Sequence, residues 1–130
     1  MRRSVTWVAA VAVSVAVLGA CGGGDDGADA AYKAPKGPAV DILKVKSGNV
    51  YFKPTELDTK PGVVQIDLHN QESGVHDLVI RDIPGFQLEV SGEGSNASGK
   101  VDLKAKQKYE FYCTIPGHKE AGMRGTITVS

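Results

Sequence analysis

The segment that decides the fold of this chain is residues 109–123, which reads Tyr109-Glu110-Phe111-Tyr112-Cys113-Thr114-Ile115-Pro116-Gly117-His118-Lys119-Glu120-Ala121-Gly122-Met123. A candidate strand ends at Cys113, a turn containing proline and glycine follows, and His118 and Met123 come next at equal five-residue spacings. This strand and loop present a thiolate, an imidazole and a thioether. Because soft ligands of this kind select copper among the common metals, the segment predicts a copper site at the end of a β-strand.

A further ligand must come from elsewhere, because residues this close in sequence cannot easily reach the opposite side of a metal. His76 is the candidate, since it opens another candidate strand after the turn-forming residues 70–74. Two histidines and a cysteinate with a long axial methionine make the blue-copper arrangement. Taken singly, these residues could be a strand-end histidine, a core methionine and an inert buried cysteine. Their order and spacing together favour a metal site formed by His76, Cys113, His118 and Met123.

The chain after residue 39 favours an all-β fold. Short runs of alternating apolar and polar residues are separated by turn residues, which is typical of strands. No segment after residue 20 shows a sustained helical repeat, so a parallel α/β fold with its crossover helices is disfavoured. About seven to eight short strands predict a two-sheet β-sandwich, and the small, polar residues 92–99 are expected to form a mobile loop. The candidate strands are residues 40–45, 63–68, 76–80, 86–90, 101–104, 109–113 and 126–129.

The copper loop resembles that of the cupredoxins, such as plastocyanin, azurin, auracyanin and halocyanin, and the resemblance covers most of residues 40–130. It implies a Greek-key β-sandwich that holds one type 1 copper ion near one end, with an edge of His118 at the surface. It also implies the ligand set His76, Cys113, His118 and Met123. The spacing from Cys113 to His118 is longer than in plastocyanin and closer to azurin-like and auracyanin-like loops. The matching residues are Phe111-Tyr112-Cys113, Pro116-Gly117-His118, Gly122-Met123-Arg124-Gly125 and the earlier segment from Asn70 to His76.

Strand parity predicts what surrounds the cysteine. If Cys113 points inward, Tyr109 and Phe111 share its inner face, while Glu110 and Tyr112 face away. The resemblance makes Tyr109 a corner tyrosine, whose hydroxyl is expected to form a structural hydrogen bond with a nearby loop.

Three polar residues near the predicted ligands are expected to have roles other than binding the metal. Asn70 and Asp77 are expected to fix the copper loop through hydrogen bonds, as groups around metal ligands commonly do. His69 lies just before the turn and is expected to be an exposed strand-end residue.

The first twenty residues have the pattern of a secretory signal. Two arginines precede the apolar run 5–17, which is too short for a comfortable membrane span. The run ends in Leu18-Gly19-Ala20-Cys21, which resembles the lipobox of bacterial lipoproteins, where the cysteine is acylated and becomes the first mature residue. We therefore expect residues 1–20 to be a lipoprotein signal peptide and Cys21 to carry the lipid.

Cys21 also fits two less favoured roles. It could be an incidental cysteine after an ordinary cleaved signal. It could also form a disulfide with Cys113, which would tie a glycine-rich tether to the far end of the domain. If Cys21 is lipidated, Cys113 is a lone thiol in an exported protein, which is open to oxidation unless a metal occupies it.

Composition sets the domain boundaries and excludes some partners. Residues 21–38 have almost no large apolar side chains and are expected to be a flexible tether, so that the cupredoxin domain spans residues 39–130. The formal net charge is zero for the whole chain and −2 without the two arginines of the signal, so a nucleic-acid partner is not expected. We expect a monomer, anchored by lipid to the outer face of a bacterial cytoplasmic membrane or in the periplasm.

The predicted function is the transfer of single electrons between redox partners of the cell envelope, such as a cytochrome, an oxidase or a reductase. Docking is expected to be transient and to use the weakly polar residues around His118, since redox interfaces are small. An enzyme is not expected, because the chain has three histidines and two are already assigned to one copper. A copper carrier or buffer without a redox role is the alternative. A structural zinc site fits the thiolate and imidazoles, but the thioether favours copper.

Overall fold

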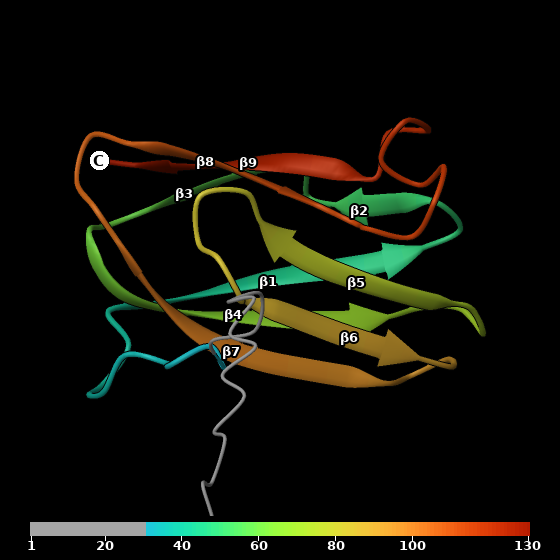
Figure 1. Cartoon of the computed structure of the whole chain (residues 1–130), viewed down its shortest axis with the longest axis horizontal. Helices are drawn as coiled ribbons and strands as arrows, with labels where there is room; N and C mark the ends of the chain where they lie inside the picture. Colours follow the sequence, from blue (N-terminus) through green and yellow to red (C-terminus); the bar gives the residue numbers. More distant parts are fainter. Residues whose placement is uncertain (1–30) are drawn as a thin grey trace, which may run out of the picture.

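Two β-sheets packed face to face make up the domain (Figure 1). The structure is a computed structural model that describes residues 31–130. One sheet has the strand order β2-β1-β4-β7 and the other has the order β3-β9-β8-β5-β6. Within the described range, no helix is long and apolar enough to cross a membrane. The strands are β1 (Asp41–Gly48), β2 (Tyr51–Lys53), β3 (Glu56–Thr59), β4 (Gly62–Asn70), β5 (Val75–Ile80), β6 (Gln87–Ser91), β7 (Asn96–Leu103), β8 (Lys108–Tyr112) and β9 (Arg124–Val129).

The chain crosses repeatedly from one sheet to the other, so neighbouring strands are often distant in sequence. β1 pairs with β4 and β3 pairs with β9 in parallel, whereas the remaining pairs are antiparallel. Each parallel pair is connected through strands that include members of the opposite sheet, which take the place of a crossover helix. The predicted all-β sandwich is confirmed, with nine strands in residues 31–130 instead of seven to eight.

Alternating residues of both sheets fill the space between them. In β4 every second residue is buried, from Val64 to Asn70, while the residues between them are half-buried. Phe52 of β2 and Phe111 of β8 meet across the sandwich with their ring centroids 5.6 Å apart. Burial of such side chains stabilises the fold by roughly 1.5–3 kcal/mol each relative to leaving them exposed. The other buried apolar residues are Leu43, Val45, Val64, Ile66, Leu68, Leu78, Ile80, Phe86, Leu88, Val90, Val101, Leu103, Tyr109, Cys113, Met123, Ile127 and Val129.

The expectation of a loop over residues 92–99 is wrong for its second half. Residues 96–99 belong to β7 and pair with β4, with Gly99 opposite Ile66. A Cβ on Gly99 would lie 2.9 Å from Phe86 and 3.0 Å from Leu88, so glycine lets the two sheets approach each other here. The small residues therefore mark a close approach of the sheets, as glycine within a strand often does.

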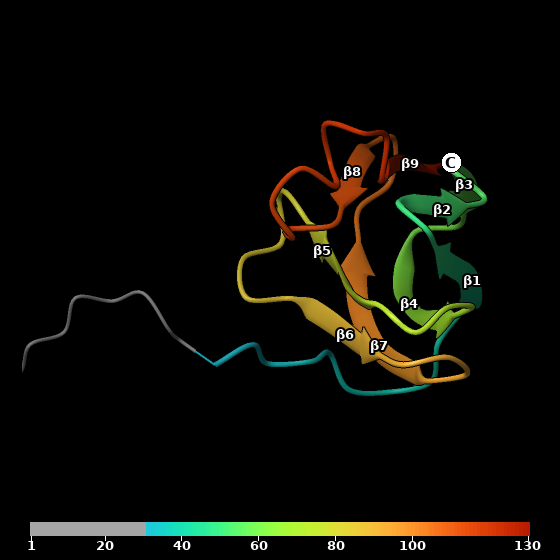
Figure 2. The ribbon, with the colours of Figure 1, turned by 90° about the vertical axis from the view of Figure 1, so that its right-hand side faces the viewer.

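Residues 31–38, which belong to the expected tether, form no strand or helix but contact the domain. The Tyr32 hydroxyl donates a hydrogen bond to Lys100 O at 2.7 Å, and its ring lies 5.3 Å from that of Phe86. The Lys100 ammonium group donates to Gly37 O at 2.8 Å. Figure 2 shows this segment running past β6 and β7. The predicted signal peptide and the predicted lipidation site at Cys21 lie outside the described residues.

The substitution Gly125→Ala should destabilise the fold. A Cβ at this position would overlap the ring of Phe111 and the backbone oxygen of Thr55. Because a backbone atom cannot move aside cheaply, we expect the free energy of unfolding of the copper-free protein to fall by about 1–3 kcal/mol in urea denaturation. Ser98→Thr adds one methyl group on an exposed part of β7 and serves as the control. Equal stability of the two variants would contradict the close packing at Gly125.

Candidate metal centre

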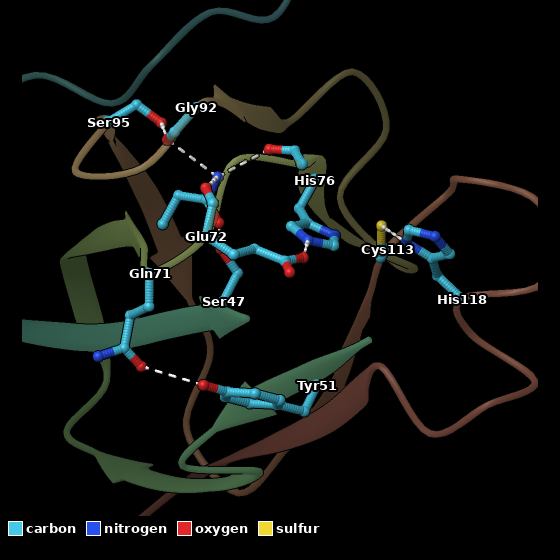
Figure 3. A network of polar contacts seen from close by, with 11 residues as sticks. Ser47, Tyr51, Gln71, Glu72, His76, Gly92, Ser95, Cys113 and His118 are labelled. Carbon is cyan, nitrogen blue, oxygen red and sulfur yellow. Dashed lines mark hydrogen bonds and ion pairs between the residues drawn. The ribbon is translucent and has the colours of Figure 1, made fainter. Parts of the chain in front are cut away.

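Three of the four predicted ligands converge at one end of the sandwich. The ligand atoms of His76, Cys113 and His118 all lie within 4.8 Å of one another. Cys113 Sγ is 3.6 Å from His118 Nδ1, and the two imidazole centroids are 5.1 Å apart. His76 and Cys113 are buried, whereas His118 is half-buried. The structure thus brings together a thiol and two imidazoles as the sequence predicts (Figure 3).

Neighbouring strands bring these residues together. Cys113 directly follows β8 and His76 is the second residue of β5, and these two strands pair antiparallel. His118 lies in the loop between β8 and β9. Figure 1 shows this loop, in red, at the end of the sandwich where β5 begins. The site therefore depends on sheet pairing between segments that are far apart in sequence.

Backbone hydrogen bonds bring Met123 to the same place. The amide of Cys113 donates to Met123 O at 3.1 Å and closes the base of the loop. The amide of Met123 in turn donates to His118 O at 3.0 Å. Met123 is fully buried. The backbone of Met123 is therefore tied to both loop ligands, and its side chain is enclosed in the domain.

The donor set fits a metal ion, and one buried atom without a hydrogen-bond partner supports this fit. Among the described residues, the buried side-chain nitrogen or oxygen without a hydrogen-bond partner is His76 Nδ1. Leaving a buried polar atom unpaired costs about 1–3 kcal/mol, which coordination to a metal would recover. Burial also raises the pKa of the Cys113 thiol. Because a metal binds the thiolate, binding must release that proton.

The buried carboxylate of Asp77 links the two ligand-bearing segments, as expected. Its Oδ1 accepts a hydrogen bond from the amide of Thr114 at 2.6 Å, and its Oδ2 accepts from the Thr114 hydroxyl and from Gln87 at 2.8 Å. Burial by itself would raise the pKa of Asp77, but the hydrogen bonds from Thr114 and Gln87 lower it below the ordinary value. The carboxylate is therefore ionised at neutral pH and accepts every bond.

Asn70 fixes the turn that precedes His76. Its fully buried side chain accepts a hydrogen bond from the Ser47 hydroxyl at 3.0 Å. Its Nδ2 lies 2.8 Å from Glu72 O, 2.8 Å from Gly74 O and 3.0 Å from Gly92 O, all carbonyl acceptors. Asn70 forms hydrogen bonds as predicted, but the prediction that it fixes the copper loop is wrong. Its bonds go to the turn that leads into β5 and to Ser47 and Gly92.

The predictions from strand parity and for the corner tyrosine Tyr109 are confirmed. Tyr109 and Phe111 are buried on the same face as Cys113, while Glu110 and Tyr112 are more exposed. The Tyr109 hydroxyl bonds to the adjacent turn, where it accepts a hydrogen bond from the amide of Lys104 at 3.0 Å.

His69 lies apart from the site, near the end of β4. Its Nδ1 is 2.7 Å from Asn96 Oδ1. His69 is therefore a strand-end residue outside the site, as expected, but its side chain is half-buried and not fully exposed.

Sequence reasoning missed Glu72. Its carboxylate reaches the buried imidazole of His76, with 2.5 Å between Oε1 and Nε2. An acidic residue in a turn is ordinarily solvated, so its residue type gives no sign of this contact. The one available signal is that Glu72 lies four residues before the predicted ligand His76. This spacing brings the two side chains together only because the turn between them folds back.

Comparisons with known proteins agree with this geometry. The family model described as copper binding proteins, plastocyanin/azurin family, matches residues 39–130. Plastocyanin of Dryopteris crassirhizoma is 36% identical over 69 residues, which cover 53% of this chain and 53% of the plastocyanin. The match thus spans about half the length of that relative.

Solved structures with the same fold include three auracyanins. Reduced auracyanin from Roseiflexus castenholzii has a TM-score of 0.62 at 20% identity, over 72% of this chain and 99% of that chain. Auracyanin B has a TM-score of 0.60 at 22% identity, over 75% and 94%. Auracyanin A, described as a "blue" copper protein from Chloroflexus aurantiacus, has a TM-score of 0.59 at 18% identity, over 68% and 98%.

The two-sheet fold and the converging sulfur and imidazole donors define the cupredoxin class. The chain belongs to the plastocyanin/azurin family of copper-binding proteins. It is a blue copper protein, and its cofactor is one copper ion.

Removing the Asp77 carboxylate should loosen the link between the ligand-bearing segments. Asp77→Ala leaves the Thr114 and Gln87 donors without their acceptor, so we expect the free energy of unfolding of the copper-free protein to fall by about 1–3 kcal/mol. Asp77→Asn keeps one acceptor oxygen and should lose less. Denaturation in urea measures both. If Asp77→Ala were as stable as the unmodified protein, the proposed link would be wrong.

Proposed function

We propose that this protein carries single electrons, and that it holds its copper through His76 Nδ1, Cys113 Sγ, His118 Nδ1 and the thioether of Met123. The observation that carries this proposal is the unpartnered, buried His76 Nδ1 beside Cys113 and His118. Two imidazoles, a cysteinate and a weak axial methionine form the blue-copper electron-transfer site. Bound copper supplies a couple that accepts or gives up one electron without a proton.

Rigidity of the ligands supports electron transfer, because every rearrangement between oxidation states adds to the barrier. The turn before His76 is fixed by Asn70, and the residue after Cys113 is fixed by Asp77. The loop is closed by the bond between Cys113 and Met123. A site held on rigid strands in this way keeps its geometry while the charge changes.

The alternative of a copper enzyme has little support in the described residues. His76, Cys113 and His118 form the one cluster of three or more His, Cys, Asp or Glu donors found in residues 31–130. His69 bonds to Asn96 and lies outside that cluster. A copper carrier or buffer uses the same ligands, and electron self-exchange separates it from an electron carrier.

The exposed residues around His118 are the docking surface we propose for redox partners such as a cytochrome, an oxidase or a reductase. The half-buried His118 is flanked in sequence by four exposed, uncharged residues: Pro116, Gly117, Ala121 and Gly122. These uncharged residues, which lie beside the exposed Glu120 and the half-buried Lys119, form a small surface that fits brief encounters. We also propose that the protein is a monomer, held at the bacterial cell envelope by a lipid on Cys21.

The copper-loaded full chain should show the intense visible absorption of a cysteinate bound to Cu(II), together with a reversible one-electron couple. Cys113→Ser should abolish the absorption because the charge-transfer donor is lost. His69→Gln, which changes the histidine outside the site, should leave it intact. Optical and electron-paramagnetic-resonance spectra make the comparison. A colourless unmodified protein would contradict the type 1 site, and slow self-exchange with a normal blue spectrum would favour the carrier.

A charge placed on the docking surface should slow electron self-exchange. Gly122 has a φ of +110° and Gly117 a φ of +85°, so side chains there would strain the backbone. Ala121 is exposed and avoids this difficulty. Ala121→Glu and Ala121→Lys should each slow self-exchange several-fold at low salt, because two like charges must meet, and less at high salt.

The matched control is Ala105→Glu, in the turn between β7 and β8 at the opposite end of the sandwich. NMR line broadening in partly oxidised samples gives the self-exchange rates. If the three variants had the same rate as the unmodified protein, electrons would leave by another surface.

A further inference from the structure

The carboxylate of Glu72 lies against a copper ligand. Glu72 Oε1 is 2.5 Å from His76 Nε2, and the Glu72 and His76 side chains are 30% and 2% exposed. Figure 3 shows Glu72 extending toward the ring of His76, on the side away from Cys113. The imidazole therefore has a carboxylate at one nitrogen and the metal position at the other.

The turn that carries Glu72 is built to hold this contact. Asn70 bonds to the carbonyl oxygens of Glu72 and Gly74, so the backbone on both sides of the carboxylate is fixed. A Cβ on Gly74 would lie 3.2 Å from Glu72 Oε1 and 3.5 Å from His76 Nε2. The contact with Glu72 would be tight and the one with His76 ordinary, so the absence of a side chain at Gly74 leaves room for the Glu72 carboxylate.

The contact decides which nitrogen of His76 carries the proton. A carboxylate accepts hydrogen bonds, so the neutral imidazole places its hydrogen on Nε2 and leaves a lone pair on Nδ1. Nδ1 is the buried atom that has no partner among the described residues. The tautomer that Glu72 favours is thus the one that can bind copper through Nδ1.

We propose that Glu72 is a positioning residue that selects the copper-binding tautomer of His76 and, through its negative charge, stabilises the oxidised form of the site. This inference rests on the proposed function above. A carboxylate bonded to a metal-ligating imidazole orients the ring and raises its basicity. An added negative charge in a poorly hydrated site favours the more positive copper state, so Glu72 lowers the reduction potential.

The substitution Glu72→Gln tests the effect of the charge. Glutamine keeps an acceptor oxygen and the side-chain length but removes the charge. The copper-loaded chain should stay blue, and its potential should move in the positive direction. At a fixed ambient potential, the ratio of Cu(I) to Cu(II) should rise by about an order of magnitude. Glu72→Ala removes the acceptor as well, and its copper uptake should also be slower.

Glu120→Gln is the matched control, since Glu120 is an exposed carboxylate of the copper loop, two residues after His118. A general change in net charge would shift the potential equally in both variants. If Glu72→Gln moves the potential no further than Glu120→Gln, the proposed charge effect is overturned.

A second measurement does not depend on copper. In the copper-free chain, at a pH where His76 is neutral, imidazole ¹⁵N shifts should show the proton on Nε2, and Glu72→Ala should shift the population toward the Nδ1 tautomer. A proton on Nδ1 in the unmodified chain would overturn the positioning role. If the unmodified chain failed to form a blue site, the function proposed above would fail, and the tautomer would still decide the role of Glu72.

Discussion

The hydrogen bonds between the Asp77 carboxylate and Thr114 are the interaction on which the copper site depends. Asp77 follows the ligand His76, and Thr114 follows the ligand Cys113. These two residues are 37 positions apart in the chain, and β5 and β8 carry them to one place. The carboxylate is buried and accepts three hydrogen bonds, so neither ligand-bearing segment can move without breaking bonds to it. The distance between the buried imidazole and the thiol is therefore set by the sheet.

A second constraint acts on the other side of His76. Asn70 fixes the turn between β4 and β5, and this turn carries the Glu72 carboxylate to the imidazole. The buried ligand is thus held from both sides, by the strand that continues into Asp77 and by the turn before it. His118 is less buried than His76 and belongs to the loop with the exposed glycines. The centre is consequently fixed inside and more exposed at one imidazole, which are the two properties that the proposed electron transfer requires.

The strands that were predicted correctly are those in which apolar and polar residues alternate over enough positions to be recognised. β4 alternates over nine residues, and β8 buries Tyr109 and Phe111 on one face, directly before the buried Cys113. β2 and β3 were missed because they have three and four residues, too few for a period of two to stand out. The first part of β7 was mistaken for a loop, because small residues are common in both turns and close sheet contacts. Glycine at position 99 is explained by Leu88 of β6 in the opposite sheet and by Phe86 just before that strand, which no local pattern reveals.

The sequence by itself determined the donor types and most of the site: a cysteine, a histidine and a methionine at fixed spacings in one loop, and a histidine that opens another strand. Short-range spacing suffices for the loop ligands, because the chain can bring them together locally. The tertiary structure decided what surrounds His76. The burial of Asp77, the bonds of Asn70 and the contact between Glu72 and His76 arise where separate turns and strands meet. An acidic residue looks the same in the sequence whether its carboxylate is solvated or lies where strands and turns meet. The tertiary structure alone tells these two cases apart.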